Sequence, residues 1–107
     1  MPDLVLLDEL LDTVPGDAAL RGAVRGWYER LAAERRASPH TLDAYLRDLA
    51  AWLGFLAGHR GGAPDIAALA DLKPGDFRAW LAARAQDGMA RSSTARALSV
   101  VRGFFHY

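Results

Sequence analysis

The sequence predicts an all-α fold of four main helices, preceded by a short helix in an N-terminal leader. Three observations lead to this prediction. Apolar residues recur every three or four positions in four segments of the 107-residue chain, which is the spacing of one face of a helix. Ser, Asp, Pro and Gly stand at the ends of these segments, where helices commonly begin and end. No segment shows the alternation of apolar and polar residues that is typical of a half-buried strand.

The leader, residues 1–16, differs in composition from the rest of the chain. Residues 1–17 contain five acids and no basic residue, whereas all 13 Lys and Arg residues follow later. Apolar residues between Leu4 and Leu11 predict a short helix that ends at Pro15-Gly16. We expect a flanking helix or a partly ordered arm, followed by one globular domain over residues 17–107.

The first two main helices have clear N-terminal signals. Residues 18–35 are expected to form the first helix, with Asp17 as the N-cap that accepts a first-turn N–H. The second begins at Ser38 as N-cap and Pro39 as first helical residue, and Gly58 is expected to end it. Their predicted core residues are Leu20, Val24, Trp27, Tyr28 and Leu31 in the first helix and Leu42, Tyr45, Leu46, Leu49, Trp52, Leu53 and Leu56 in the second.

Shorter elements follow a glycine-rich loop. Asp65 is expected to cap a turn over residues 66–69, and the third helix should run from Pro74 until Gly88 ends it. The fourth helix is expected to begin near Ser92, which spacing suggests as its N-cap, and to run to the end of the chain. The predicted core residues here are Phe77, Trp80 and Leu81 in the third helix and Thr94, Ala97, Leu98, Val101 and Phe105 in the fourth.

Composition excludes several classes of protein. Hydrophobic residues make up 51% and charged residues 24%, which is typical of a globular domain. Without cysteine the chain has neither disulfides nor thiolate metal sites. The apolar runs are far shorter than the roughly 20 residues that span a bilayer, and the acidic N-terminus is unlike a signal peptide. We therefore expect a cytoplasmic protein without a membrane partner or a cofactor.

Two helix faces opposite the core stripes point to a nucleic-acid partner. On the fourth helix this face holds Ser92, Arg96, Ser99, Gly103 and His106, with Arg102 at its edge, and no carboxylate follows Asp87. The second helix places His40, Ala44, Arg47 and Ala51 opposite its core. Ser38 and Thr41 lie at its N-terminus, where free N–H groups attract phosphate. Arginine and hydroxyl side chains suit both phosphates and base edges.

Structural roles compete with this interpretation. Ser38 and Ser92 can be caps, Thr41 can bond within the first turn, and Arg47 can pair with Asp43 or Asp48. The periodicity alone therefore leaves DNA binding and an ordinary solvated surface both open.

Two stretches resemble the N-terminal domain of Xer-type tyrosine recombinases. Residues 34–49 (ERRASPHTLDAYLRDL) are similar to the entry into that family's second helix, and residues 92–105 (SSTARALSVVRGFF) to its fourth helix. The similarity covers residues 20–107. It implies a SAM-like helical domain, often called the core-binding domain, whose second and fourth helices enter the major groove of a recombination half-site.

The resemblance also implies which residues bind and which do not react. Its DNA-contacting positions correspond to Ser38, His40, Thr41, Arg47, Ser92, Ser93, Arg96 and Arg102. The family's nucleophile and its stabilising Arg, Lys and His groups belong to a C-terminal catalytic domain that this sequence lacks, and Tyr107 corresponds to a packing position. The implied partners are double-stranded DNA, the catalytic domain, and further protomers in a tetramer on DNA. The three histidines show no metal-ligand spacing.

Two other functions remain as alternatives. A non-catalytic helical protein-interaction module has the same fold class, and the equivalent domain of a phage or integron integrase shares the implied fold. A small enzyme is not favoured, since the sequence has no glycine-rich phosphate loop and no nucleophile elbow.

Overall fold

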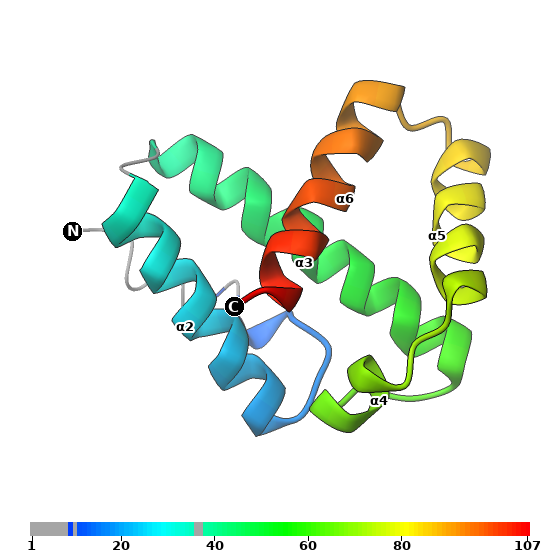
Figure 1. Ribbon diagram of the computed structural model, residues 1–107, viewed down its shortest axis with the longest axis horizontal. Helices are drawn as coiled ribbons and strands as arrows, with labels where there is room; N and C mark the ends of the chain where they lie inside the picture. The colour runs from blue at the N-terminus through cyan, green and yellow to red at the C-terminus, as the bar shows by residue number, and fades with distance from the viewer. Residues whose placement is uncertain (1–8, 10, 36–37) are drawn as a thin grey trace.

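The computed structural model describes residue 9, residues 11–35 and residues 38–107, and every regular element within them is a helix (Figure 1). The all-α prediction is confirmed. The helices are α2 (Ala18–Arg35), α3 (Pro39–Arg60), α4 (Ile66–Ala70), α5 (Pro74–Gln86) and α6 (Arg91–Phe105).

Three predicted N-caps are present. The Leu20 amide donates to Asp17 Oδ1 at 2.9 Å at the start of α2. Ser38 accepts the amide of Thr41 at 3.2 Å ahead of α3, and Asp65 accepts that of Ala68 at 2.7 Å ahead of α4. Each cap satisfies one of the amides that a helix start leaves without an intrahelical acceptor.

The predicted end of α3 at Gly58 is wrong. Helix α3 continues to Arg60, and Gly61 caps it in the left-handed conformation with φ 80°. Gly61 donates its amide to the Ala57 carbonyl at 3.1 Å, which closes the helix end. Gly88, with φ 76°, takes the predicted position just beyond α5.

The N-cap predicted at Ser92 is also wrong. Helix α6 begins at Arg91, its N-cap is Ala90, and no side chain caps its first amides. Ser92 lies inside the first turn, and its hydroxyl makes no capping bond there.

The buried side of α6 is rotated from the predicted one. Ala97 and Val101 are buried as expected, but Val100 and Phe104 join them. Phe105, predicted in the core, remains 45% exposed. Its ring contacts that of Trp52 edge-on at 5.6 Å, so it covers the rim of the core.

The core lies where α6 crosses α3, with α2 alongside (Figure 1). Trp27, Trp52 and Trp80 are buried within it, as predicted. From the leader, Leu11 and Val14 are also buried in this cluster. Residues 9, 11 and 12 are helical, whereas the leader residues from Leu4 to Leu7 lie outside the described part of the chain.

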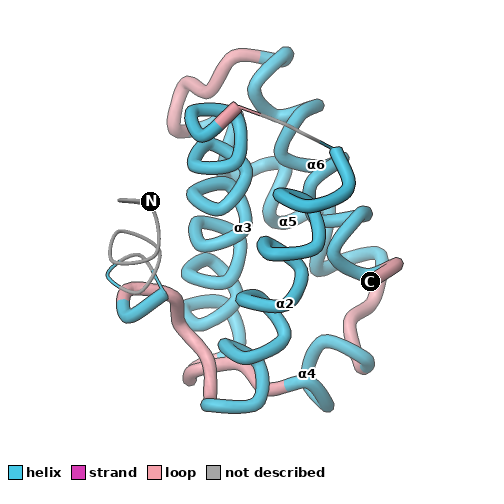
Figure 2. Tube along the Cα trace, turned by 90° about the vertical axis from the view of Figure 1, so that its left-hand side faces the viewer, coloured by secondary structure: helices cyan, strands magenta, loops and turns pink. Residues whose placement is uncertain are grey.

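The N-terminal ends of α3 and α6 lie at the same end of the molecule, the upper edge in both views (Figures 1 and 2). Helices α2 and α3 run side by side beneath that edge in Figure 2. The two helices that the sequence singled out for DNA contact therefore both start along this edge, α3 at its left and α6 at its right in Figure 1.

Candidate nucleic-acid interface

The basic face consists of the eight residues of α3, its cap and α6 that the sequence predicts to contact DNA. Most of it is open to solvent. Ser38, His40, Arg47, Ser92, Arg96 and Arg102 are exposed, and Thr41 and Ser93 are half-buried. Helix α3, with its cap, carries the first three and Thr41, and α6 carries the others. The fold therefore brings the predicted contact residues to the outside of two adjacent helices.

Ser38 and Thr41 form a small hydroxyl cluster at the start of α3. Their side-chain oxygens lie 3.0 Å apart, in addition to the capping bond from the Thr41 amide. The predicted capping role of Ser38 is thus confirmed, and so is the local bond expected of Thr41. Both remain at the surface, beside exposed His40.

Arg47 makes the ion pair within α3 that its spacing allows. Its Nη2 lies 3.4 Å from Asp43 Oδ2, one turn earlier. The Arg47 side chain is 63% exposed, and exposed pairs of this kind are weak and easily exchanged. The guanidinium is therefore available to a stronger anion.

Arg96 is held more firmly, by a residue of another helix. Its Nε and Nη2 donate to the two carboxylate oxygens of Asp48 at 2.8 and 3.1 Å. Asp48 is 8% exposed. The hydrogen bonds and the charge of Asp48 raise the pKa of Arg96. The sequence placed Asp48 only as a possible partner of Arg47.

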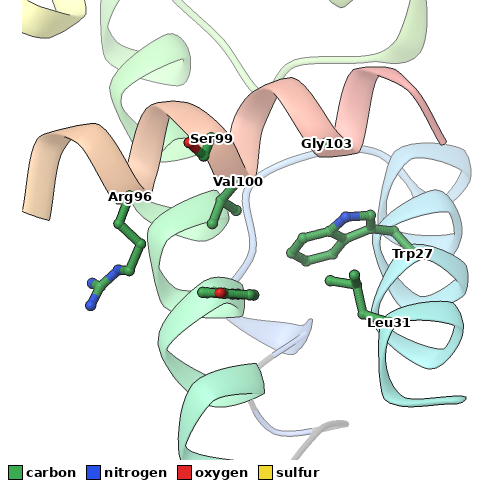
Figure 3. Close-up of a pocket in the computed structure, with 7 residues that line it drawn as sticks. Trp27, Leu31, Arg96, Ser99, Val100 and Gly103 are labelled. Atoms are coloured by element: carbon green, nitrogen blue, oxygen red, sulfur yellow. The ribbon is translucent and has the colours of Figure 1, made fainter. Parts of the chain in front are cut away.

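A small hollow lies beside Arg96, between α2, α3 and α6. Figure 3 shows Arg96, Ser99, Val100 and Gly103 along α6, with Trp27 and Leu31 facing them from α2. Its volume is about 100 Å³. Sites for small organic ligands are typically about 300–1,000 Å³, so this hollow does not suggest a substrate pocket.

The histidines give no sign of a metal centre. His59 Nε2 lies 3.0 Å from Asp76 Oδ1, within hydrogen-bonding distance, and His40 and His106 are exposed. Across residues 9, 11–35 and 38–107, no group of three or more His, Cys, Asp or Glu could hold a metal ion. In the same described ranges, no helix is both long and apolar enough to cross a membrane.

Comparison with known proteins identifies the domain. Residues 24–107 match the family described as "Phage integrase, N-terminal SAM-like domain". The chain is 40% identical over 94 residues to a protein named Tyrosine recombinase XerC from Mesorhizobium japonicum. Proteins of the same name from Methylobacterium sp. and Rhodospirillum centenum are 47% and 48% identical over 93 and 85 residues.

These alignments cover most of this chain but a minor part of each relative. They include 88%, 87% and 79% of the chain, and 30%, 29% and 25% of the three relatives. No solved structure matches significantly. The relatives are tyrosine recombinases, and the matched part is their N-terminal SAM-like domain, so their catalysis lies elsewhere in their chains. The resemblance noted in the sequence is confirmed: the chain belongs to the family of phage integrase N-terminal SAM-like domains.

Proposed function

We propose that this chain is the DNA-binding N-terminal domain of a site-specific tyrosine recombinase, which grips the major groove of a recombination half-site through α3 and α6. The observation that carries the proposal is the basic face, whose two helices begin at the same end of the molecule. Its arginines and hydroxyls are the side chains that bind phosphates and base edges.

Two further features of the basic face support a close approach to DNA. The first amides of α6 have no side-chain cap, so they remain available to a phosphate oxygen. Small residues, Ala51 of α3 and Ser99 and Gly103 of α6, are exposed between the longer side chains. They allow the helix backbones to come near the groove.

The whole protein, in this proposal, performs DNA strand exchange of the chromosome-dimer-resolution type in the cytoplasm. Its catalytic domain closes on the opposite side of the DNA, and further protomers complete a tetramer. The name Tyrosine recombinase, which the relatives carry, supports a role in recombination. A clamp of two linked domains raises the effective concentration of each, so the N-terminal domain alone is expected to bind weakly. The equivalent domain of a phage or integron integrase would use the same face.

One observation favours protein interaction as a second candidate function. Ile66, Phe105 and Tyr107 are 51%, 45% and 50% exposed, and all three border an apolar hollow of about 390 Å³ between α4 and the end of α6. Exposed apolar patches often mark protein contacts. This patch and the basic face involve different residues, so binding assays can separate them.

The decisive experiment measures duplex-DNA affinity by fluorescence anisotropy over a range of salt concentrations. With Arg47, Arg91 and Arg102 as the cations that contact phosphates, the log of the affinity should fall with log salt at a slope of about −3. Arg47→Ala should flatten the slope by about one unit if it contacts a phosphate. Arg78→Ala, an exposed position on α5, is the control and should leave the slope unchanged.

Chemical-shift mapping with a duplex locates the contact even when binding is weak. Shifts should concentrate at residues 38–47 and 92–102. Shifts confined to α4 and residues 105–107, without shifts on the basic face, would reject DNA binding by this face. They would favour the protein-interaction function instead.

A further inference from the structure

We propose that Asp48 is a positioning residue for DNA recognition, which holds the Arg96 guanidinium so that its outer edge reads a guanine in the major groove. The inference rests on the proposed function, because it assigns a task within the same basic face. It concerns a residue that is buried beneath the face, where it cannot touch DNA itself.

The geometry of the pair leaves one edge of Arg96 unused by Asp48. A guanidinium has five N–H donors in a fixed planar fork. Asp48 engages Nε and one hydrogen of Nη2, at 2.8 and 3.1 Å. One Nη1 hydrogen and the second Nη2 hydrogen form the terminal edge of the guanidinium, which Asp48 does not engage.

The difference in burial between the two side chains shows which side of the guanidinium faces solvent. The Asp48 side chain is 10% exposed, whereas that of Arg96 is 47% exposed. Figure 3 shows the Arg96 side chain leaving α6 with its guanidinium directed away from Trp27 and Leu31. The carboxylate therefore lies on the protein side of the guanidinium, and the remaining donors lie toward solvent.

The remaining donors match one base better than the others. Guanine presents two adjacent acceptors, O6 and N7, in the major groove, and arginine commonly binds them with two parallel N–H groups. An arginine that is already fixed in its binding orientation loses less side-chain freedom when it binds. Asp48 thus acts on sequence discrimination through Arg96.

The same pair lowers the general attraction of Arg96 for DNA. The charges of Asp48 and Arg96 cancel at a distance, so Arg96 adds little to long-range attraction of phosphates. Removing the Asp48 charge should then have two opposite effects. Non-specific binding should strengthen and become more salt-dependent, while discrimination between bases should weaken. A purely structural role for Asp48 does not predict this combination.

Asp48→Asn, compared with Asp43→Asn, tests the proposal. Both variants remove one acid from α3, but Asp43 pairs with exposed Arg47. Wild type and variants are each used to select binders from a randomised duplex pool, and the affinities of selected and singly altered duplexes are compared. We expect Asp48→Asn to lose about tenfold discrimination at one G·C pair. Asp43→Asn should keep it. Asp48→Asn should also steepen the salt slope by about one unit, whereas Asp43→Asn should change the slope little, because the exposed Arg47 already exchanges Asp43 for a phosphate.

Arg96→Lys is the second variant, and it remains informative if Asp48→Asn does not fold. Lysine preserves the charge pair with Asp48 but has no planar fork, so it should lose the same G·C preference while its thermal melting changes little. Unchanged preference in Arg96→Lys, or in a folded Asp48→Asn, would overturn the inference.

The outcomes for the wild type separate the two proposals. If the wild type binds duplexes in a salt-dependent way but selects no sequence, the positioning role of Asp48 fails and the DNA-binding function stands. If it shows no salt-dependent DNA binding, the proposed function fails and this inference fails with it.

Discussion

Replacing Leu11 with alanine tests whether the acidic leader is a separate arm or part of the fold. Leu11 is 5% exposed and belongs to the core cluster together with Val14. The chain that follows it is tied to the loop after α3, because the Asp17 amide donates to the Pro64 carbonyl at 3.3 Å. These contacts give the leader a role in stability that its composition did not predict.

The expected magnitude follows from the burial of the side chain. Leucine-to-alanine substitutions at buried positions cost about 2–5 kcal/mol, since they remove apolar contacts and leave a cavity. In a domain of this size each kcal/mol lowers the melting temperature by about 4–8 °C. Leu11→Ala should therefore melt at least about 8 °C below the wild type.

Thermal unfolding followed by circular dichroism measures this difference. Asp12→Ala is the matched control, because Asp12 neighbours Leu11 in sequence and is exposed; it should change stability by less than about 0.5 kcal/mol. DNA affinity, measured at a temperature where both variants are folded, should not fall in either. If Leu11→Ala melts together with the wild type, the leader does not contribute to the core and the reasoning is refuted.

Three further predictions concern the end of α3, acid stability and catalysis. Gly58→Ala should stabilise the protein by about 0.5–1 kcal/mol because Gly58 lies within a helix, whereas Gly61→Ala should destabilise it by more than about 1 kcal/mol because its φ is 80°; chemical denaturation measures both. The Lys73 amide, which donates to the Asp76 carboxylate, lowers the pKa of Asp76 from its usual 3.8. The resulting stabilisation is present above pH 3.8 and is lost as the pH falls through the lowered pKa, so Asp76→Asn should lose less stability on acidification than the wild type. Incubation with a suicide half-site should give no covalent DNA adduct, and an adduct that disappears in Tyr107→Phe would contradict the packing role assigned to Tyr107.

The beginnings of the helices could be predicted because their signals are local. Asp17, Ser38 and Asp65 each bond an amide three residues further on, so residue type and spacing were sufficient. Helix ends were less predictable. Gly58 and Gly61 both follow the apolar stripe of α3, and only the backbone conformation shows which of them caps the helix.

The start and orientation of α6 depended on contacts that the sequence does not display. Ser92 is a better N-cap residue than Ala90, yet the helix begins one residue before Ser92. Phe105 has the expected helical spacing, but Phe104 takes the buried position and contacts Trp27 edge-on at 5.9 Å. Packing against α2 and α3 therefore decided which of two adjacent aromatic residues entered the core.

The candidate site shows the same division between local and distant partners. Asp43 lies one turn from Arg47, so their pair could be expected from the sequence. Asp48 and Arg96 are 48 residues apart and meet only because α6 crosses α3. Helix α6 contains no acidic residue, but Asp48 of α3 lies buried beneath the face that the two helices form.

This difference between the two ion pairs predicts different tasks for the two arginines. The exposed pair of Arg47 and Asp43 can open at little cost, so the Arg47 side chain can change its conformation to contact a nearby phosphate. Separating Arg96 from Asp48 would leave a buried carboxylate without its partner, which is costly, so Arg96 is expected to keep its orientation when DNA binds. Arg47 should consequently govern the salt dependence of binding and Arg96 its sequence preference. The test is to replace each arginine by alanine and to measure the salt slope and the sequence preference of both variants. Equal losses of the two quantities in the two variants would contradict this assignment.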